Sequence, residues 1–115
     1  MTKTMTVADA RDHIIRTMPE KTLQAFVVQA ARSAGWAVYH TFDSRRSEPG
    51  FPDLVMIRGG RMIAAELKRH KKQPTEAQER WLNHFRQVSS AEVYVWTPED
   101  WVDRRIIETL ERDHE

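Results

Sequence analysis

The sequence has no cysteine, no internal repeat and no long apolar run. Without cysteine the chain can form neither a disulfide nor a thiolate metal site, and we expect a reducing, cytoplasmic setting. No apolar run approaches the roughly 20 residues that a membrane-spanning helix needs, so we expect no membrane partner. The N-terminal residues lack the apolar core of a signal peptide. A composition of 40% hydrophobic and 30% charged residues then favours a soluble globular protein.

No linker-like stretch divides the 115 residues, which suit one compact domain with a real core. We expect a leading segment over residues 1–16, with a short helix from about Val7 to Arg16. A single domain should follow over residues 17–115.

Three further helices are predicted by N-terminal caps that precede apolar stripes. Thr17 with Glu20, and Thr75 with Gln78, have the spacing of capping boxes, in which each side chain bonds the backbone at the other position. Thr97 is an N-cap candidate for one final helix that would run to the C-terminal region. Each stripe of apolar residues recurs at helical spacing, so each helix should pack one side on a core.

Four strands are predicted between these helices. Residues 36–42 and 91–96 are rich in β-branched and aromatic side chains. Two apolar runs, residues 53–58 and 61–68, flank Gly59–Gly60 and should form a hairpin that helices cover on both faces. The resulting order predicts an α/β fold with a mixed central β-sheet flanked by helices.

The hairpin turn brings three polar residues together. If Gly59 and Gly60 form a two-residue turn, Asp53 lies directly opposite Glu66. Because side chains alternate between the faces of a strand, Lys68 lies on the same face as Glu66, one step further along.

Two facing carboxylates destabilise a sheet unless a positive charge lies between them. Oxygen ligands without sulfur or a histidine cluster suit Mg²⁺ or Mn²⁺, which can also hold a phosphate group. Asp53, Glu66 and Lys68 therefore indicate a metal-dependent site that acts on phosphodiester bonds. The alternative, solvated strand ends with a neutralising lysine, explains any one of these residues alone but not the three on one face.

Basic residues are concentrated around the same hairpin. Six of them lie between Arg58 and Lys72, against the single acid Glu66, and such a block suits a surface that contacts phosphates. On charge alone, a solvated strand end and loop would explain it as well. Arg45 and Arg46, in the loop before the hairpin, could contact phosphates or only solvate that loop.

The hairpin also carries a known motif. Pro52-Asp53 followed by Glu66-Leu67-Lys68 matches the PD-(D/E)xK motif. The stretch GFPDLVMIRGGRMIAAELKRHKKQPTEAQERWLNHFRQ, followed by VYVWTPEDW, resembles the VRR-NUC family, the virus-type replication-repair nucleases. The resemblance runs from about Glu20 to Leu110. It implies a restriction-endonuclease-like core and the activity of a Mg²⁺- or Mn²⁺-dependent DNA endonuclease that cuts branched DNA such as Holliday junctions. Small members of the family occur in phages and bacteria, and the resemblance implies that this chain forms a homodimer as they do.

The resemblance also implies roles for single residues. Asp53 and Glu66 match the metal-binding acids, with the backbone carbonyl of Leu67 as a further ligand, and Lys68 matches the catalytic lysine. Glu20 matches an acid that such nucleases place on their first helix, and its spacing to Leu23 and Val27 puts it on the core-facing stripe of that helix. It could equally complete the capping box that begins at Thr17. Gln78 could brace Lys68 or a phosphate, or complete its capping box. The residues expected to contact nucleic acid are Arg45, Arg46, Arg69, Lys71 and Lys72.

Two other readings stay open. The same fold could serve as a non-catalytic module that binds nucleic acid, although the intact Asp53, Glu66 and Lys68 argue against it. The chain could also be an exonuclease or act on RNA, because a fold does not fix a substrate.

Overall fold

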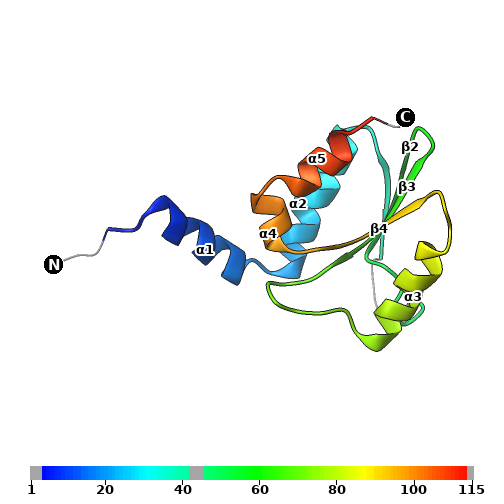
Figure 1. Ribbon diagram of the computed structural model, residues 1–115, viewed down its shortest axis with the longest axis horizontal. Helices are drawn as coiled ribbons and strands as arrows, with labels where there is room; N and C mark the ends of the chain where they lie inside the picture. Colours follow the sequence, from blue (N-terminus) through cyan, green and yellow to red (C-terminus); the bar gives the residue numbers. More distant parts are fainter. Residues whose placement is uncertain (1–3, 42–45, 114–115) are drawn as a thin grey trace.

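A four-stranded sheet with five helices around it makes up the computed structural model, which describes residues 4–41 and 46–113 (Figure 1). In chain order the elements are α1 (Val7–Thr17), α2 (Glu20–Ser33), β1 (Ala37–His40), β2 (Leu54–Arg58), β3 (Arg61–Leu67), α3 (Glu76–Arg86), β4 (Ala91–Trp96), α4 (Pro98–Val102) and α5 (Arg105–Glu111). Helix α1 projects away from the sheet and contacts α4. In the described part of the chain, no helix has the length and apolar character needed to cross a membrane.

The sheet is mixed, as the sequence predicted. Its strand order is β1-β2-β3-β4, with the first three strands antiparallel and β4 parallel to β3. The hairpin register is also confirmed: Arg58 pairs with Arg61, and Leu54 pairs with Ala65 at the other end. Both turn glycines have positive φ, 51° at Gly59 and 87° at Gly60, as a primed two-residue turn requires.

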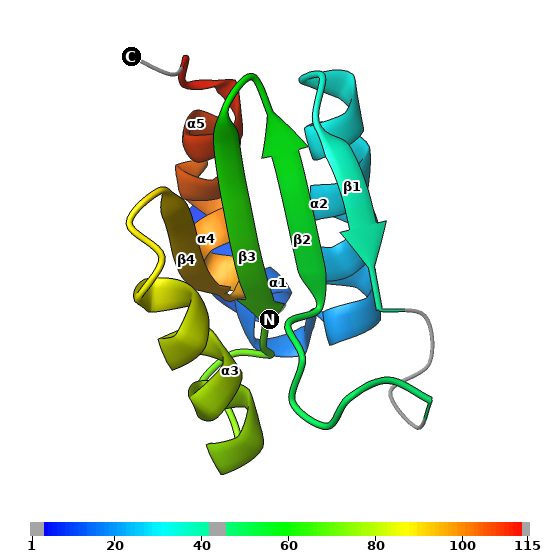
Figure 2. The same ribbon diagram turned by 90° about the vertical axis from the view of Figure 1, so that its right-hand side faces the viewer.

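The two faces of the sheet differ in cover. Helices α2, α4 and α5 lie on one face, where Leu54, Met56 and Ile63 are fully buried (Figure 2). On the other face α3 packs against β4 and β3, so in the described residues the expectation that helices cover both faces of the hairpin is only partly right. Tyr39 and Ile57, on β1 and β2, consequently keep 61% and 54% of their surface exposed.

The helix starts at Thr75 and Thr97 are confirmed, and the one at Thr17 is wrong. Thr17 is the last residue of α1, and its hydroxyl donates to the carbonyl of His13 at 2.7 Å. Met18 precedes Pro19, and proline disfavours a helical backbone in the residue before it, so α1 ends there. Pro19 is then the N-cap of α2, with no side-chain hydrogen bond.

The C-terminal helix is divided in two, whereas the sequence predicted one. Arg104 has a φ of 64°, a left-handed conformation that ends α4 and begins α5. Arg105 donates to the carboxylates of Asp100 at 2.8 Å and Asp103 at 3.2 Å, which holds the two short helices together.

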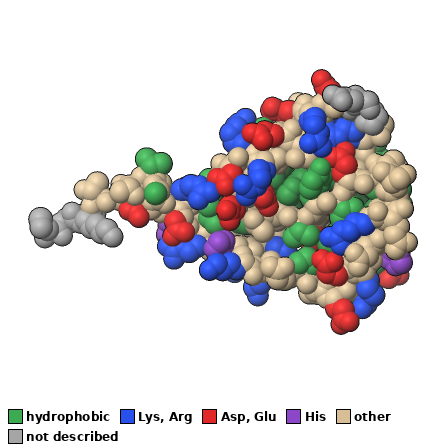
Figure 3. All heavy atoms as spheres, in the orientation of Figure 1, with side chains coloured by type: hydrophobic (Ala, Val, Ile, Leu, Met, Phe, Trp, Pro, Cys, Tyr) green, Lys and Arg blue, Asp and Glu red, His purple; other side chains and the backbone are tan. Residues whose placement is uncertain are grey.

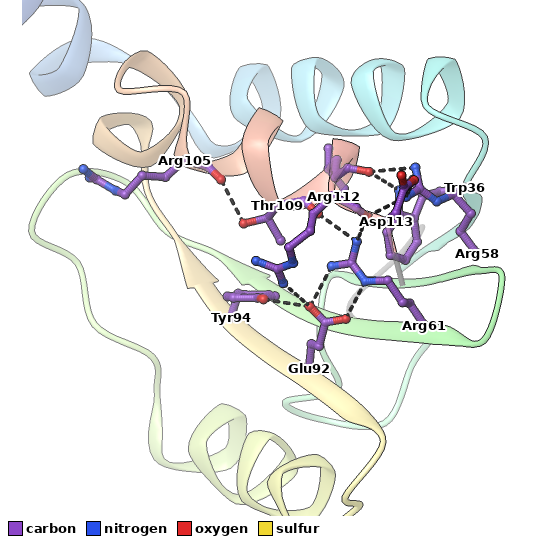
Figure 4. Close-up of polar contacts among 10 residues, drawn as sticks. Trp36, Arg58, Arg61, Glu92, Tyr94, Arg105, Thr109, Arg112 and Asp113 are labelled. Carbon is purple, nitrogen blue, oxygen red and sulfur yellow. Dashed lines mark hydrogen bonds and ion pairs between the residues drawn. The ribbon is translucent and has the colours of Figure 1, made fainter. Parts of the chain in front are cut away.

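Arg58 and Arg61, at the turn end of the hairpin, bind the ends of two helices. Their guanidinium groups lie 5.2 and 4.9 Å from the centre of the Trp36 ring (Figure 4). Arg58 donates to the carbonyls of Ala34, after α2, and Leu110, in α5, both at 2.9 Å. These contacts fasten the hairpin to the helical layer.

Arg61 is more deeply held than Arg58, with 3% of its surface exposed. It donates two hydrogen bonds to the carboxylate of Glu92, at 2.8 and 2.7 Å, and one to the carbonyl of Thr109 at 3.0 Å. This ion pair raises the pKa of Arg61 and lowers that of Glu92. Arg58 and Arg61 therefore serve the fold, and the expected phosphate-contacting block does not include them.

We expect Arg61→Ala to lower the free energy of unfolding by about 3 kcal/mol, because it leaves part-buried acceptors without a donor. Arg80→Ala is the matched control, since its ion pair with Glu76 is long, at 3.9 Å, and exposed. That variant should change stability by no more than about 0.5 kcal/mol. Urea unfolding of both variants measures the difference, and equal effects would contradict the role given to Arg61.

Candidate active site

Asp53, Glu66 and Lys68 meet where β2 begins and β3 ends. A carboxylate oxygen of Asp53 (Oδ2) accepts the backbone N–H of Leu67 at 2.8 Å, which ties the start of β2 to the end of β3. The backbone N–H of Lys68 donates to the carbonyl of Trp96 at 2.9 Å. Three strands thus fix the position of the cluster that the hairpin register predicted.

Glu66 is the buried member of the pair, with 1% of its surface exposed. Within the described part of the chain its Oε2 atom has no hydrogen-bond partner. Burial, then the charge of Asp53 and a hydrogen bond to that carboxyl, raise the pKa of Glu66 to about 9, and Lys68 opposes this shift. At neutral pH the metal-free site therefore holds a proton on Glu66, next to Asp53.

These atoms fit a hard divalent cation. The donors are carboxylate oxygens, one of them buried without a partner, and Lys68 alone does not hold the pKa of Glu66 at its usual value. No group of three or more His, Cys, Asp or Glu residues surrounds such a position in the part of the chain that the structure describes. A cation that keeps several waters needs only one or two carboxylates, so Asp53 and Glu66 suffice.

Glu20 and Gln78 occupy different surroundings from this pair. Glu20, the first residue of α2, is exposed, whereas Leu23 and Val27 of the same stripe are fully buried. The expectation that Glu20 faces the core is therefore wrong. The amide oxygen of Gln78 accepts the backbone N–H of Thr75 at 2.8 Å, so its capping role is confirmed. The catalytic roles of Glu20 and Gln78 stay predictions, as does the role of the Leu67 carbonyl as a metal ligand.

Basic side chains follow the site directly. Arg69, Lys71 and Lys72 are exposed in the loop after β3, and Lys71 has a left-handed φ of 64°. Arg46 is exposed in the loop before β2, and Arg45 lies outside the described residues. Of the predicted basic block, the part after Lys68 lies beside the site.

Thr41 also supports the site, and the sequence analysis missed it. Its backbone N–H donates to the carbonyl of Asp53 at 2.9 Å, and its hydroxyl donates to that of Pro52 at 3.1 Å. Because His40 pairs with Leu54, an extension of this register by one residue places Thr41 opposite Asp53. The sequence analysis did not predict how β1 pairs with β2, so it could not place Thr41 beside Asp53.

The loop before Asp53 packs on α3. Phe51 makes edge-to-face contacts with Trp81 and Phe85, with ring centres 5.0 and 6.0 Å away. Gly50 has a φ of 84°, and a Cβ atom there would lie 2.4 Å from the carbonyl carbon of Ala77. The residues that lead into β2 are therefore positioned by their packing against α3.

No family model matches the sequence, and a comparison with curated proteins finds no match. Among solved structures, the chain is similar to one described as "VRR_NUC domain", with 29% sequence identity and a TM-score of 0.60. The match covers 76% of this chain and 92% of that one.

We expect Gly50→Ala to lower the free energy of unfolding by about 3 kcal/mol or more, because it adds a clash with backbone to a left-handed conformation. Gly59→Ala is the matched control: φ is also positive, at 51°, but a Cβ there meets no atom within 4 Å. It should lose about 1 kcal/mol, the conformational term alone. Losses of equal size in urea unfolding would show that the contact with α3 contributes nothing.

We expect the metal-free protein to lose stability as the pH rises from about 5 to 9. Glu66 has an ordinary pKa of 4.5 when unfolded and about 9 when folded, so folding takes up a proton between these values. Raising the pH therefore favours the unfolded chain. Glu66→Gln should flatten this dependence, measured by urea unfolding in EDTA. Glu76→Gln, which removes an exposed carboxylate, should keep it. Parallel pH profiles for wild type and Glu66→Gln would contradict the raised pKa.

Proposed function

Because the chain belongs to the VRR-NUC family, we propose that it is a Mg²⁺- or Mn²⁺-dependent nuclease that hydrolyses phosphodiester bonds in DNA. The observation that carries this proposal is the buried, unpartnered Oε2 atom of Glu66 beside the carboxyl of Asp53. A carboxyl pair that is unfavourable on its own is what a site for a divalent cation needs.

The three residues have separate tasks. Asp53 and Glu66 would hold the cation, and Glu66 would give up its proton on binding it. A Mg²⁺ or Mn²⁺ ion held there would supply a more acidic water and offset the negative charge of the phosphate. Lys68, buried to 9% exposure next to both acids, orients the attacking water or stabilises the charge that develops on the phosphate.

The substrate is DNA, with branched structures such as Holliday junctions preferred and cut internally. The preference for branches comes from the family resemblance, and the exposed Arg69, Lys71 and Lys72 beside Lys68 supply a phosphate-contacting loop. A homodimer would place two sites on opposite strands of one junction, and a two-fold arrangement is the commonest in small oligomers.

The test is cleavage of a labelled four-way junction, a flap, a linear duplex and a closed circle, each with Mn²⁺ or with EDTA. We expect Asp53→Asn and Lys68→Gln to lower the cleavage rate by about 10²-fold or more. Arg80→Gln, a change at an exposed residue of α3, should cut like wild type. Cutting of the closed circle identifies an endonuclease, because an exonuclease needs an end.

Two results would overturn the proposal. Cleavage that persists in EDTA or in both site variants would place the activity elsewhere. Binding of the junction by wild type without any cleavage in Mn²⁺ would make the chain a non-catalytic binding module. Sedimentation of the wild type measures the dimer independently of either result.

A further inference from the structure

Most arginines of the described residues are already held by acids or by backbone carbonyls. They are Arg11, Arg16, Arg58, Arg61, Arg80, Arg86, Arg105 and Arg112. Figure 3 shows the result where α1 meets α4, with basic and acidic side chains interleaved. Such neutralised surfaces attract a polyanion weakly.

Apart from Arg104 at the start of α5, the basic side chains that lack such a partner within the described ranges lie in two places. One is the loop after β3, with Arg69, Lys71 and Lys72. The other is the outer side of α2, with Lys21 and Arg32, both exposed. The first belongs to the proposed active site, and the second has no role in it so far.

A groove runs along this side of α2 to β1. Its polar lining is Lys21, Gln24, Gln29, Arg32, Ser33 and His40, and no acid lines it. Together with Ala25 and Val28, the α2 members of the lining recur at steps of three and four residues, so they share one helical face. The groove offers two ammonium or guanidinium groups together with amide and hydroxyl donors, the groups that proteins use to bind phosphate and sugar oxygens.

Two other grooves of the molecule lack this character. The one at α1 has Asp9, Asp12 and Arg16, and Arg16 pairs with Asp12 at 2.8 Å. The one between β4 and α5 has two arginines, but Asp100 and Glu108 also line it. The groove on α2 therefore differs from both in carrying positive charge that no acid in its lining offsets.

The groove reaches the end of β1, one residue from a contact that supports the site. His40 lines the groove and ends β1, and the next residue is Thr41, which donates to the carbonyls of Pro52 and Asp53. Lys21 and Arg32 lie about 16 Å apart along the helix, at 1.5 Å per residue. That span equals about five base steps of DNA at 3.4 Å each, enough to contact several phosphates.

We propose that the α2 groove binds the sugar–phosphate backbone of a DNA duplex arm next to the bond that is cut. The inference rests on the proposed nuclease function and extends it, because it assigns a second contact surface outside Asp53, Glu66 and Lys68. Binding there is independent of base sequence, since phosphates carry no sequence information.

The experiment measures the anisotropy of a labelled duplex and a labelled four-way junction in EDTA, over a series of salt concentrations. We expect Lys21→Gln and Arg32→Gln each to weaken binding several-fold and to lower the slope of log affinity against log salt by about 0.9. Arg104→Gln is the matched control, because Arg104 is an exposed cation that does not line the groove. It should leave both quantities near the wild-type values.

The outcomes separate this inference from the nuclease proposal. If wild type binds and cleaves while Lys21→Gln and Arg32→Gln keep the full salt slope, the groove is not a DNA contact and the nuclease stands. If Arg104→Gln weakens binding as much, the effect is one of total charge, and the groove has no special part. If both groove variants change the sedimentation of the protein but not its DNA affinity, the groove holds a second copy of the chain. Wild type that neither binds nor cuts DNA would overturn both ideas.

Discussion

The register of the β2–β3 hairpin is the constraint on which the site depends. A shift of one residue between these strands would move either Asp53 or Glu66 to the opposite face of the sheet. Two devices at the other end of the hairpin prevent it: glycines at both turn positions, and Arg58 and Arg61 bound to the carbonyl ends of α2 and α5. Because β3 also pairs with β4, its position is set from both sides. The contacts at the turn therefore hold in register the end of the hairpin that carries Asp53 and Glu66.

Burial gives the site its chemistry and makes it a source of instability. A carboxyl at 1% exposure beside a second carboxyl binds a proton up to a pKa of about 9, so the fold tolerates the pair chiefly in its protonated form. A cation that replaces this proton would offset the repulsion between the carboxylates of Asp53 and Glu66 while Glu66 stays buried. Thr41, Leu67 and Trp96 contribute backbone hydrogen bonds that keep the strands in place in either state. Stability of the metal-free fold and binding of a cation would therefore make opposite demands on the same two side chains.

The sequence predicted the α/β class, the hairpin register, the capping box at Thr75 and the helix start at Thr97, because each follows from local chemistry. Its errors came from effects that extend beyond a motif. Pro19 constrains Met18, which removes Thr17 from the role of a cap. A left-handed Arg104 is not what its side chain favours, so the break between α4 and α5 could not be read. The basic residues between Arg58 and Lys72 do not form one patch, because β3 separates those at the turn from those after Lys68. Arg61 and Leu67, the ends of β3, lie about 20 Å apart at 3.3 Å per strand residue.

That division explains how a chain with a net charge of +1 can present a surface for DNA. The net charge includes the arginines that pair with Glu92, Asp100 and Asp103. In each of these ion pairs the carboxylate largely cancels the electric field of the arginine. What a phosphate encounters is the arrangement of the unpaired cations. In the described residues these lie in the loop after β3 and on the groove side of α2, with Arg104 apart from both. The paired arginines stabilise the fold instead. Affinity for DNA would then depend on a few exposed side chains and fall steeply with salt, even though the composition is nearly neutral.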